Sequence, residues 1–294
     1  MSTARCEPKT RNTASSRCKF DWGLFCRIVI TPRGKVYTGL DDDGSPITFD
    51  EWIMKGIHAE KKADRFYPMP YFSDSVSTSE DKTTWSNGYG QTFIIKEGNK
   101  GLTQSYNQDY CLSNRLASFN DGIIRRAFIF DNKGKVWGCA NKNGQAGFET
   151  TIFCTTADIT QPSEISEPKV DYTFIVPAEF SAKEAIDTDL NVIELDGLED
   201  VEMVAVKGDT DTEISFVSVC GEADITTEMA AIAGEPDCWL VNGANPATAP
   251  QLNGGKFTIA NSQLNGNEIT LAPPNVLFEN GLAFKECLNT VQLG

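Results

Sequence analysis

One short pattern occurs twice in this chain at an offset of 100 residues, and it constrains the fold more than any other feature. RGKVYTG stands at 33–39 and KGKVWGC at 133–139. Each copy follows an apolar run, Ile-Val-Ile at 28–30 and Phe-Ile-Phe at 128–130. A run of β-branched or aromatic residues, a turn and a second run are typical of a β-hairpin. We therefore expect hairpins at 26–40 and 126–139.

A helix is predicted after the first hairpin. Thr48 and Glu51 have the spacing of a capping box, in which each side chain bonds to the backbone of the other residue. The helix should run over 49–62, with Trp52, Ile53 and Ile57 on its apolar face. Pro68 and Pro70 follow, and proline cannot continue a helix.

The next segments alternate between polar and apolar character. Residues 73–87 are polar and predict a long surface loop. Residues 91–106 predict another hairpin, with its turn at 97–101, and the Gly-Tyr-Gly at 88–90 indicates turn geometry before that strand. A short helix is expected near 112–116, ending at 120–122.

From residue 171 onward, short strand candidates recur between turn signals. They include YTFIV, NVIEL, VEMVAV, EISFVSV, CWLVNG, KFTIA, EITLA, NVLFE and LAFKECL. This spacing predicts a β-sandwich of immunoglobulin-like size. One stretch, EADITTEMAAIAGE, predicts a helical turn. The fold class is therefore mainly β: a sandwich or barrel with one flanking helix, followed by an Ig-like sandwich.

Charge is unevenly distributed and suggests where the domains divide. Residues 1–165 hold 21 Lys and Arg against 19 Asp and Glu, whereas residues 166–294 hold 5 against 22. The change coincides with a proline-containing segment at 158–170. We expect a flexible N-terminal segment at 1–20, a β domain at 21–165 and an acidic domain at 170–294. The acidic domain would repel nucleic acid.

Catalytic motifs are lacking. His58 is the single histidine and lies in the predicted helix, where a structural role is far commoner than catalysis. No phosphate-binding or dinucleotide-binding glycine motif is present, and the acidic runs at 41–44 and 207–213 do not fit a calcium loop. We expect no enzymatic activity, cofactor or metal site. Carboxylate pairs of a hydrolase, which need only be close in space, stay open as an alternative.

Several further expectations concern the environment of the chain. The nine cysteines have no zinc-ligand spacing, so we expect mostly reduced thiols, with Cys6 and Cys18 the most reactive. The formation of one or two disulfides at a later stage stays open. No apolar stretch is long enough to cross a membrane, and the first residues do not form a secretory signal. The turns of the repeated pattern carry Arg33, Lys35, Lys133 and Lys135. These charges keep hairpin tips solvated or contact a neighbouring subunit.

The arrangement resembles the tail tube proteins of long-tailed phages. The resemblance rests on the helix TFDEWIMKGIHAEKK between hairpins, the loop SDSVSTSEDKTTWSN, the hairpin GYGQTFIIKEG and the added C-terminal module. It covers roughly residues 20–160 and involves no diagnostic motif. The second domain is larger relative to the first than in a bare tube protein.

This resemblance implies a virion component that is made in the host cytoplasm. Family members form hexameric rings that stack into a tube, contact other tail proteins and let DNA pass without binding it specifically. On that basis, the candidate interface or lumen residues are Gln91, Thr92, Phe93, Ile95, Lys96, Thr103 and Gln104.

Two other functions are weighed against a tail tube. A cell-surface or carbohydrate-binding fibre or decoration protein would need aromatic residues that stack on sugars. Residues 166–294 contain only Trp239 and Tyr172 besides phenylalanines, which makes such a binder less favoured. A hydrolase would need a cleft lined with acidic residues.

Overall fold

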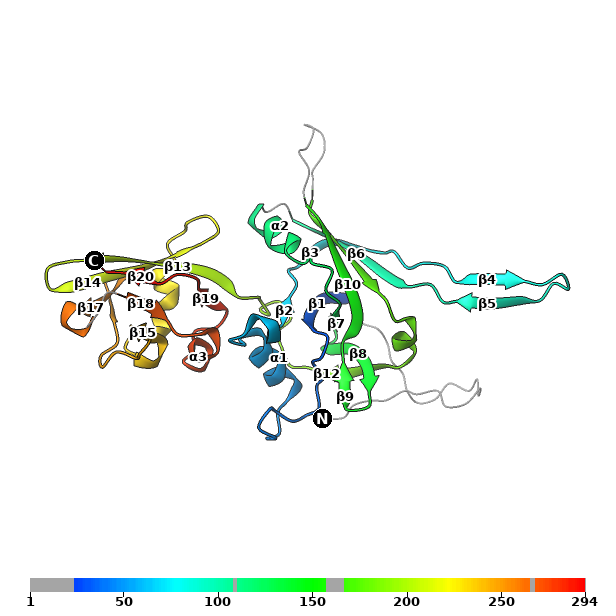
Figure 1. Ribbon diagram of the computed structural model, residues 1–294, viewed down its shortest axis with the longest axis horizontal. Coiled ribbons are helices and arrows are strands. Elements are labelled where there is room, and N and C mark those ends of the chain that lie inside the picture. The colour runs from blue at the N-terminus through cyan, green and yellow to red at the C-terminus, as the bar shows by residue number, and fades with distance from the viewer. Residues whose placement is uncertain (1–23, 108–109, 157–166, 265–267, 294) are drawn as a thin grey trace, which may run out of the picture. The chain divides into compact units, whose positions relative to one another are not determined.

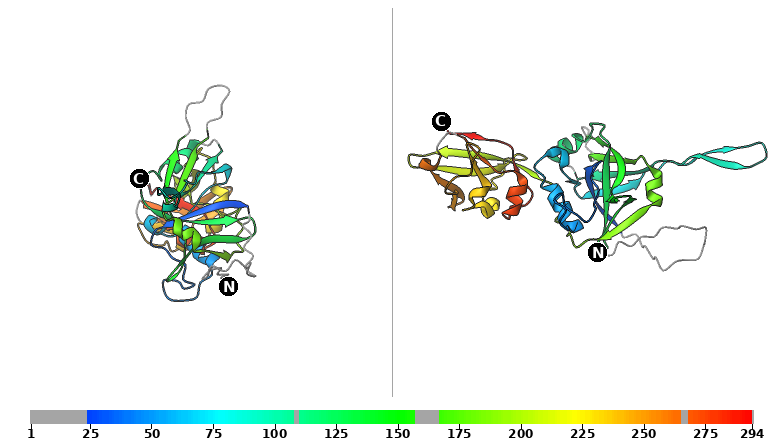
Figure 2. Two further views of the ribbon diagram at one scale, coloured as in Figure 1. Left: turned by 90° about the vertical axis from the view of Figure 1, so that its right-hand side faces the viewer. Right: turned by 60° about the horizontal axis from the view of Figure 1, so that its bottom comes forward.

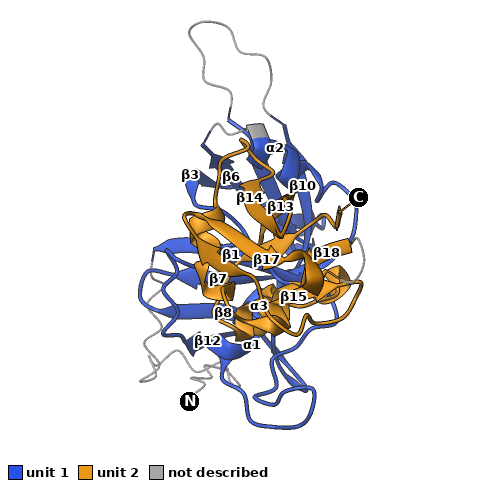
Figure 3. Cartoon of the chain, turned by 90° about the vertical axis from the view of Figure 1, so that its left-hand side faces the viewer, with its two compact units in different colours: residues 1–54, 66–196 blue, residues 55–65, 197–294 orange. Residues whose placement is uncertain are grey.

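The structure is a computed structural model that describes residues 24–107, 110–156, 167–264 and 268–293. The chain forms two compact units, which are coloured separately in Figure 3. Unit 1 comprises residues 1–54 and 66–196, and unit 2 comprises residues 55–65 and 197–294. The expected flexible N-terminal segment at 1–20 lies outside the described residues.

Unit 1 is built on one ten-stranded, curled sheet, a long two-stranded extension and two helices (Figure 1). Its strands are β1 (Phe25–Pro32), β2 (Tyr67–Pro68), β3 (Phe72–Ser77), β4 (Thr83–Ser86), β5 (Thr92–Lys96), β6 (Lys100–Tyr106), β7 (Arg125–Asp131), β8 (Lys135–Asn141), β9 (Gly144–Ala146), β10 (Phe148–Thr155), β11 (Lys169–Phe174) and β12 (Lys183–Asp187). Its two α-helices are α1 (Phe49–Ile57), which begins in this unit, and α2 (Tyr110–Ala117), and it also contains the 3₁₀ helix η2 (Pro177–Ser181).

The two copies of the repeated pattern pair with each other. Strands β1 and β7 are antiparallel, with Ile28 opposite Ile129 and Val29 opposite Phe128. Position 129 is the repeat equivalent of position 29, and position 128 is that of position 28. The two strands are therefore related by an approximate local two-fold axis. This pairing at the centre of unit 1 buries apolar side chains on both faces of both strands.

The second copy forms the expected hairpin, and the first copy does not. Strands β7 and β8 pair around a turn in which Asp131 Oδ1 accepts hydrogen bonds from the backbone N–H groups of Lys133 (2.8 Å) and Lys135 (3.1 Å). In the first copy, Thr31 stands at the equivalent position. A threonine hydroxyl has fewer acceptor positions than a carboxylate, and Asp131 also accepts a hydrogen bond from Trp137 Nε1 at 2.8 Å.

The segment that follows the turn in the first copy pairs with strand β9 instead of with β1. Tyr37 exchanges two backbone hydrogen bonds with Gln145, of 2.8 and 2.9 Å. The predicted hairpin at 26–40 is therefore wrong, because β1 pairs with β7 and β2 instead.

The curled sheet encloses the core of unit 1 and carries α1 on its other side. Ile28, Ile129 and Phe148 belong to the enclosed core, to which α2 adds Leu116. On the outer face, Phe128 contacts the rings of Phe49 and Trp52 of α1, with ring centroids 5.5 and 5.8 Å apart. The flanking helix and the barrel-like sheet confirm the predicted β class.

The capping box at the start of α1 is confirmed. Glu51 Oε2 accepts hydrogen bonds from the backbone N–H of Thr48 at 2.8 Å and from its hydroxyl at 2.7 Å, and Glu51 N–H donates to Thr48 Oγ1 at 3.2 Å. The helix ends at Ile57 rather than at residue 62, and a separate 3₁₀ helix, η1 (Lys62–Asp64), follows. The short helix α2 lies where the sequence predicts one.

Residues 72–106 form one long β-hairpin, which we call the arm. Strand β3 pairs with β6, and β4 pairs with β5 beyond them. In Figures 1 and 2 the arm extends away from the other strands of unit 1. The predicted loop at 73–87 is therefore one side of this hairpin. The predicted turn at 97–101 is also wrong, because Glu80 N–H donates to Asn99 O (2.8 Å) and joins the two sides.

Unit 2 contains two small sheets around a core of its own. One sheet has the order β16-β17-β14-β13-β19 and the other β15-β18-β20, and both contribute to a single apolar cluster that includes Phe216, Trp239 and Ile269. This agrees with the predicted two-sheet sandwich. The elements are β13 (Glu199–Lys207), β14 (Asp211–Ser218), η3 (Thr226–Ile232), η4 (Pro236–Cys238), β15 (Trp239–Val241), β16 (Gln251–Asn253), β17 (Lys256–Ala260), η5 (Asn261–Gln263), β18 (Glu268–Leu271), α3 (Pro274–Glu279), β19 (Lys285–Cys287) and β20 (Val291–Gln292).

Some expected strands of the acidic domain have other roles. YTFIV lies largely in β11 and pairs with β10 and β6 of unit 1. NVIEL contains a turn, and NVLFE lies in α3 after two prolines. The helical turn expected within 222–235 is η3.

The units divide at Asp196 and Gly197, later than the segment at 158–170. Strands β11 and β12 belong to the curled sheet, so their acidic residues contribute to unit 1. Unit 2 holds 7 Lys and Arg against 16 Asp and Glu, a net charge of −9. The charge difference between the units is therefore smaller than the sequence division suggests.

Candidate functional site

The arm turns tightly at its outer end. Asn87 N–H donates to Gln91 O at 2.9 Å, and Asn87 Oδ1 accepts from the N–H groups of Tyr89 and Gln91, both at 3.0 Å. Gly90 has φ +78°, in the left-handed region that favours glycine. This confirms the turn geometry expected for Gly-Tyr-Gly at 88–90. The turn sets Trp85 of β4 directly opposite Phe93 of β5.

One face of the arm is apolar and exposed. Trp85 and Phe93 stack with ring centroids 5.9 Å apart, and Ile95 follows two residues further along β5, at the register shift between β4 and β5. Their exposed fractions are 53%, 51% and 67%. We call these three residues the apolar face of the arm.

The opposite face has a different character. Thr84 lies opposite Ile94, and Ser86 lies opposite Thr92, with their hydroxyls 2.8 Å apart. Ile94 is the single large apolar residue that strands β4 and β5 place here, and it is 56% exposed. The arm is thus amphipathic, and its polar face offers matched positions for control substitutions.

An exposed hairpin of this kind favours association. A two-stranded hairpin is marginally stable in water, and an apolar edge strand is a template for pairing with another chain. Residues 72–106 carry three lysines against four acidic residues, so copies of the arm would repel one another only weakly. The arm can therefore dock by its apolar face or add strands at its free edges.

The candidate residues at 91–104 divide into two groups. Gln91, Thr92, Phe93, Ile95 and Lys96 are all exposed in the outer part of the arm. Thr103 and Gln104 lie on β6, where the arm joins the body of unit 1. Thr103 donates a short hydrogen bond to Asp171, and Gln104 is 1% exposed. A buried Gln104 does not fit a role at an interface or a lumen.

The four basic residues of the repeated turns do not form one cluster at hairpin tips. Arg33 pairs with Glu149 at 3.0 Å, which in turn holds the buried Arg126 at 3.1 Å. Lys135 pairs with Asp187 at 2.6 Å. Lys35 is half-buried, and Lys133 is exposed next to Asp131. Arg33 and Lys135 therefore have structural partners within unit 1.

His58 has a structural environment in unit 2. It is 1% exposed, its ring stacks on Phe278 at 4.1 Å, and its Nε2 accepts a hydrogen bond from Phe284 N–H at 3.0 Å. A buried imidazole that accepts a backbone bond is well suited to packing. This placement does not bring the histidine to an open site.

The described cysteines fall into two classes. Cys111 and Cys220 are disulfide-bonded. Free thiols occur at Cys26, Cys139, Cys154, Cys238 and Cys287. Burial raises the pKa of both Cys139 and Cys154 to about 12. Such thiols are protonated at neutral pH and therefore weak nucleophiles. Cys6 and Cys18, which we expect to be the most reactive, lie outside the described residues.

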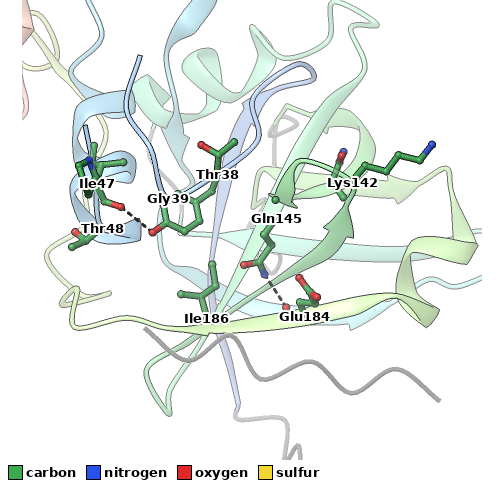
Figure 4. Close-up of a pocket in the computed structure, with 12 residues that line it drawn as sticks. Thr38, Gly39, Ile47, Thr48, Lys142, Gln145, Glu184 and Ile186 are labelled. Atoms are coloured by element: carbon green, nitrogen blue, oxygen red, sulfur yellow. Dashed lines mark hydrogen bonds between the residues drawn. The ribbon is translucent and has the colours of Figure 1, made fainter. Parts of the chain in front are cut away.

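Unit 1 also contains an open cavity of about 650 Å³ (Figure 4). It lies among the segment 37–48, the β8–β9 turn and strand β12. Gly144 allows these parts to approach closely, because a Cβ atom there would stand 2.1 Å from Tyr37 O. The cavity therefore depends on the backbone contact between Tyr37 and Gln145.

Sequence reasoning missed two residues that matter for these sites. Trp85 lies in what the sequence predicts as a loop, although Asn-Gly between TTWS and QTFII is a strong hairpin signal. Gln145 lines the cavity and is 3% exposed, and no local pattern marks it.

Within the described parts of the chain, no group of three or more His, Cys, Asp or Glu residues is placed to hold a metal ion. None of the described helices is long and apolar enough to cross a membrane. The sequence matches no known protein-family model, and a search of curated proteins found no similar sequence.

Proposed function

We propose that this protein is a structural, self-assembling component whose copies associate through the arm. The observation that carries the proposal is the exposed apolar face formed by Trp85, Phe93 and Ile95. Burying these side chains against another copy removes apolar surface from water, which is the main driving force for association. A second copy is the simplest partner because the arm is nearly neutral and has two free strand edges.

We further propose that the assembly is a virion tail tube of the kind that the sequence resembles, with hexameric rings stacked for DNA passage. The polar surface on one face of the curled sheet supports this proposal. This face is the side of β10, β11 and β6 that points away from the core. Thr151 lies opposite Thr173 there, and Thr103 and Ser105 continue the same face. Hydroxyl-rich strands with few cationic side chains offer little salt-dependent affinity for phosphate. Such a surface suits a wall along which DNA moves.

The alternative of a carbohydrate-binding decoration or fibre protein has less support. Trp239 and Tyr172 are each 0% exposed, so neither is a stacking platform. Unit 2 then serves best as an outward module of the assembly, without a catalytic role or a cofactor.

Sedimentation velocity on the full chain tests the proposal. Phe93→Ser and Trp85→Ser should shift the protein from large assemblies to monomers, because each removes part of the apolar face. Thr84→Ser and Ser86→Ala alter the opposite face and should leave assembly intact. Negative-stain images should show rings or tubes for the parent and the two control variants. A parent chain that stays monomeric at all concentrations would rule the proposal out.

A further inference from the structure

The cavity beside Gln145 contains a buried polar atom that lacks a partner. Gln145 is 3% exposed, and its Oε1 makes no hydrogen bond. Its Nε2 donates to Glu184 O at 3.0 Å. The reverse orientation of the amide would place two oxygens against each other, so the hydrogen bond identifies the unpaired atom as the carbonyl oxygen. The cavity therefore requires a hydrogen-bond donor.

The backbone holds Gln145 rigidly in this position. Its N–H and C=O are both bonded to Tyr37, and its side-chain amide is bonded to β12. Figure 4 shows the Gln145 amide between Ile186 and Glu184. An acceptor fixed by three hydrogen bonds is preorganised for a ligand, because little conformational freedom remains to be lost on binding.

The charges near the cavity favour a cation. Glu184 lines the cavity and is largely buried. Burial raises the pKa of the Tyr37 hydroxyl, and the nearby carboxylates of Asp50 and Glu51 raise this pKa further. Lys142 is the single basic residue among those that line the cavity, and Figure 4 shows its ammonium group directed away from Gln145. The carboxylates in or near the cavity, those of Glu184, Asp50 and Glu51, therefore outnumber its single lining lysine.

We propose that this cavity binds a positively charged hydrogen-bond donor, a guanidinium or alkylammonium group, which donates to Gln145 Oε1. The group has two chemical sources: an arginine or lysine side chain on another protein chain, or a free small amine. The volume accommodates either one. This proposal does not depend on the arm or on self-assembly, so the failure of one leaves the other standing.

Isothermal titration calorimetry on the full chain tests the proposal with three probes. N-acetyl-L-argininamide presents the guanidinium on a peptide backbone and should bind. Its citrulline analogue keeps the N–H donors without the charge and should bind at least about tenfold more weakly, since hydrogen bonds to charged groups are the stronger ones. Ethylguanidine lacks the backbone. Equal binding of ethylguanidine indicates a free amine as the source, and weaker binding indicates a side chain.

One substitution at Gln145 tests the acceptor. Gln145→Met removes the carbonyl at similar size and should weaken binding of N-acetyl-L-argininamide by about tenfold or more. Gln251→Met in unit 2 is the matched control and should bind like the parent. Thermal unfolding of each variant establishes that it is folded.

Three results would overturn the proposal. One is the absence of binding of both guanidinium probes by the folded parent. Another is equal affinity for the citrulline and arginine probes, which would show that charge is irrelevant. The third is unchanged binding by a folded Gln145→Met variant, which would mean that only water satisfies the carbonyl.

Discussion

At the scale of single residues, the most consequential feature of unit 1 is a buried charge network. Arg126 Nη1 donates to Glu179 Oε1 (3.1 Å) and to Gly147 O (2.7 Å), while its Nη2 donates to Glu149 Oε1 (3.1 Å). Arg126 and Glu149 are both less than a tenth exposed. The network joins β7, β10 and η2, and Arg33 attaches the first repeated turn to it. Removing one partner from such a network leaves a buried charge that is poorly compensated.

We expect Glu149→Ala to lower the free energy of unfolding by about 3 kcal/mol. Asp187→Ala provides a control, because Asp187 is mostly exposed and its pair with Lys135 should contribute about 1 kcal/mol or less. Urea unfolding followed by circular dichroism measures both. Equal effects of the two substitutions would contradict the structural role of the network.

Thiol reactivity gives a second residue-scale prediction. Since burial raises the pKa of Cys139 and Cys154 to about 12, iodoacetamide at pH 8 should leave both unmodified in the folded chain and modify both in urea. Peptide mass spectrometry reads out each position. Because the thiols stay protonated in the folded state, the pH also affects stability. Their contribution to the free energy of unfolding is complete below pH 9 and is lost as the pH rises from 9 towards 12. Rapid native modification of Cys139 or Cys154 would show that these strands open readily.

At the scale of elements, local signals predict the structure where their partners are local. The capping box of α1 and the β7–β8 hairpin need only residues that are close in the chain. The pairing of β1 with β7 was not predictable, because a strand's own pattern shows that it is buried but does not identify its neighbour. For the arm, the polar composition of 73–87 predicts a loop, although an exposed strand is equally polar. Gln145 was missed because its unpaired carbonyl arises from tertiary contacts.

The cap of α1 can be tested directly. Thr48→Ala removes the hydroxyl that bonds Glu51 N–H and Oε2, so we expect a loss of about 1 kcal/mol in the free energy of unfolding. Thr48→Ser keeps the hydroxyl and should cost only a few tenths of that value. Denaturant titration compares the two variants. The cap would be unimportant if alanine and serine proved equally stable.

At the scale of the whole molecule, the division at Asp196 and Gly197 changes what a truncation does. A chain that ends at residue 165 lacks β11 and β12, which pair with β10 and β6 and with β8. We expect this truncated chain to lose cooperative thermal unfolding, because β10, β6 and β8 each lose one of their neighbouring strands in the curled sheet. The sequence-based division at 158–170 leads to the opposite expectation. A soluble chain of residues 1–165 that unfolds cooperatively would support the division at 158–170.

The central claim is that another copy of the protein covers the apolar face of the arm. Hydrogen–deuterium exchange of the backbone amides of 92–96, measured at high and at low protein concentration, tests it most directly. We expect slow exchange in the assembled protein and fast exchange after dilution to monomers, with the amides of β7 protected in both. Fast exchange of 92–96 at every concentration, together with protected β7, would show that the arm remains uncovered and would contradict the account.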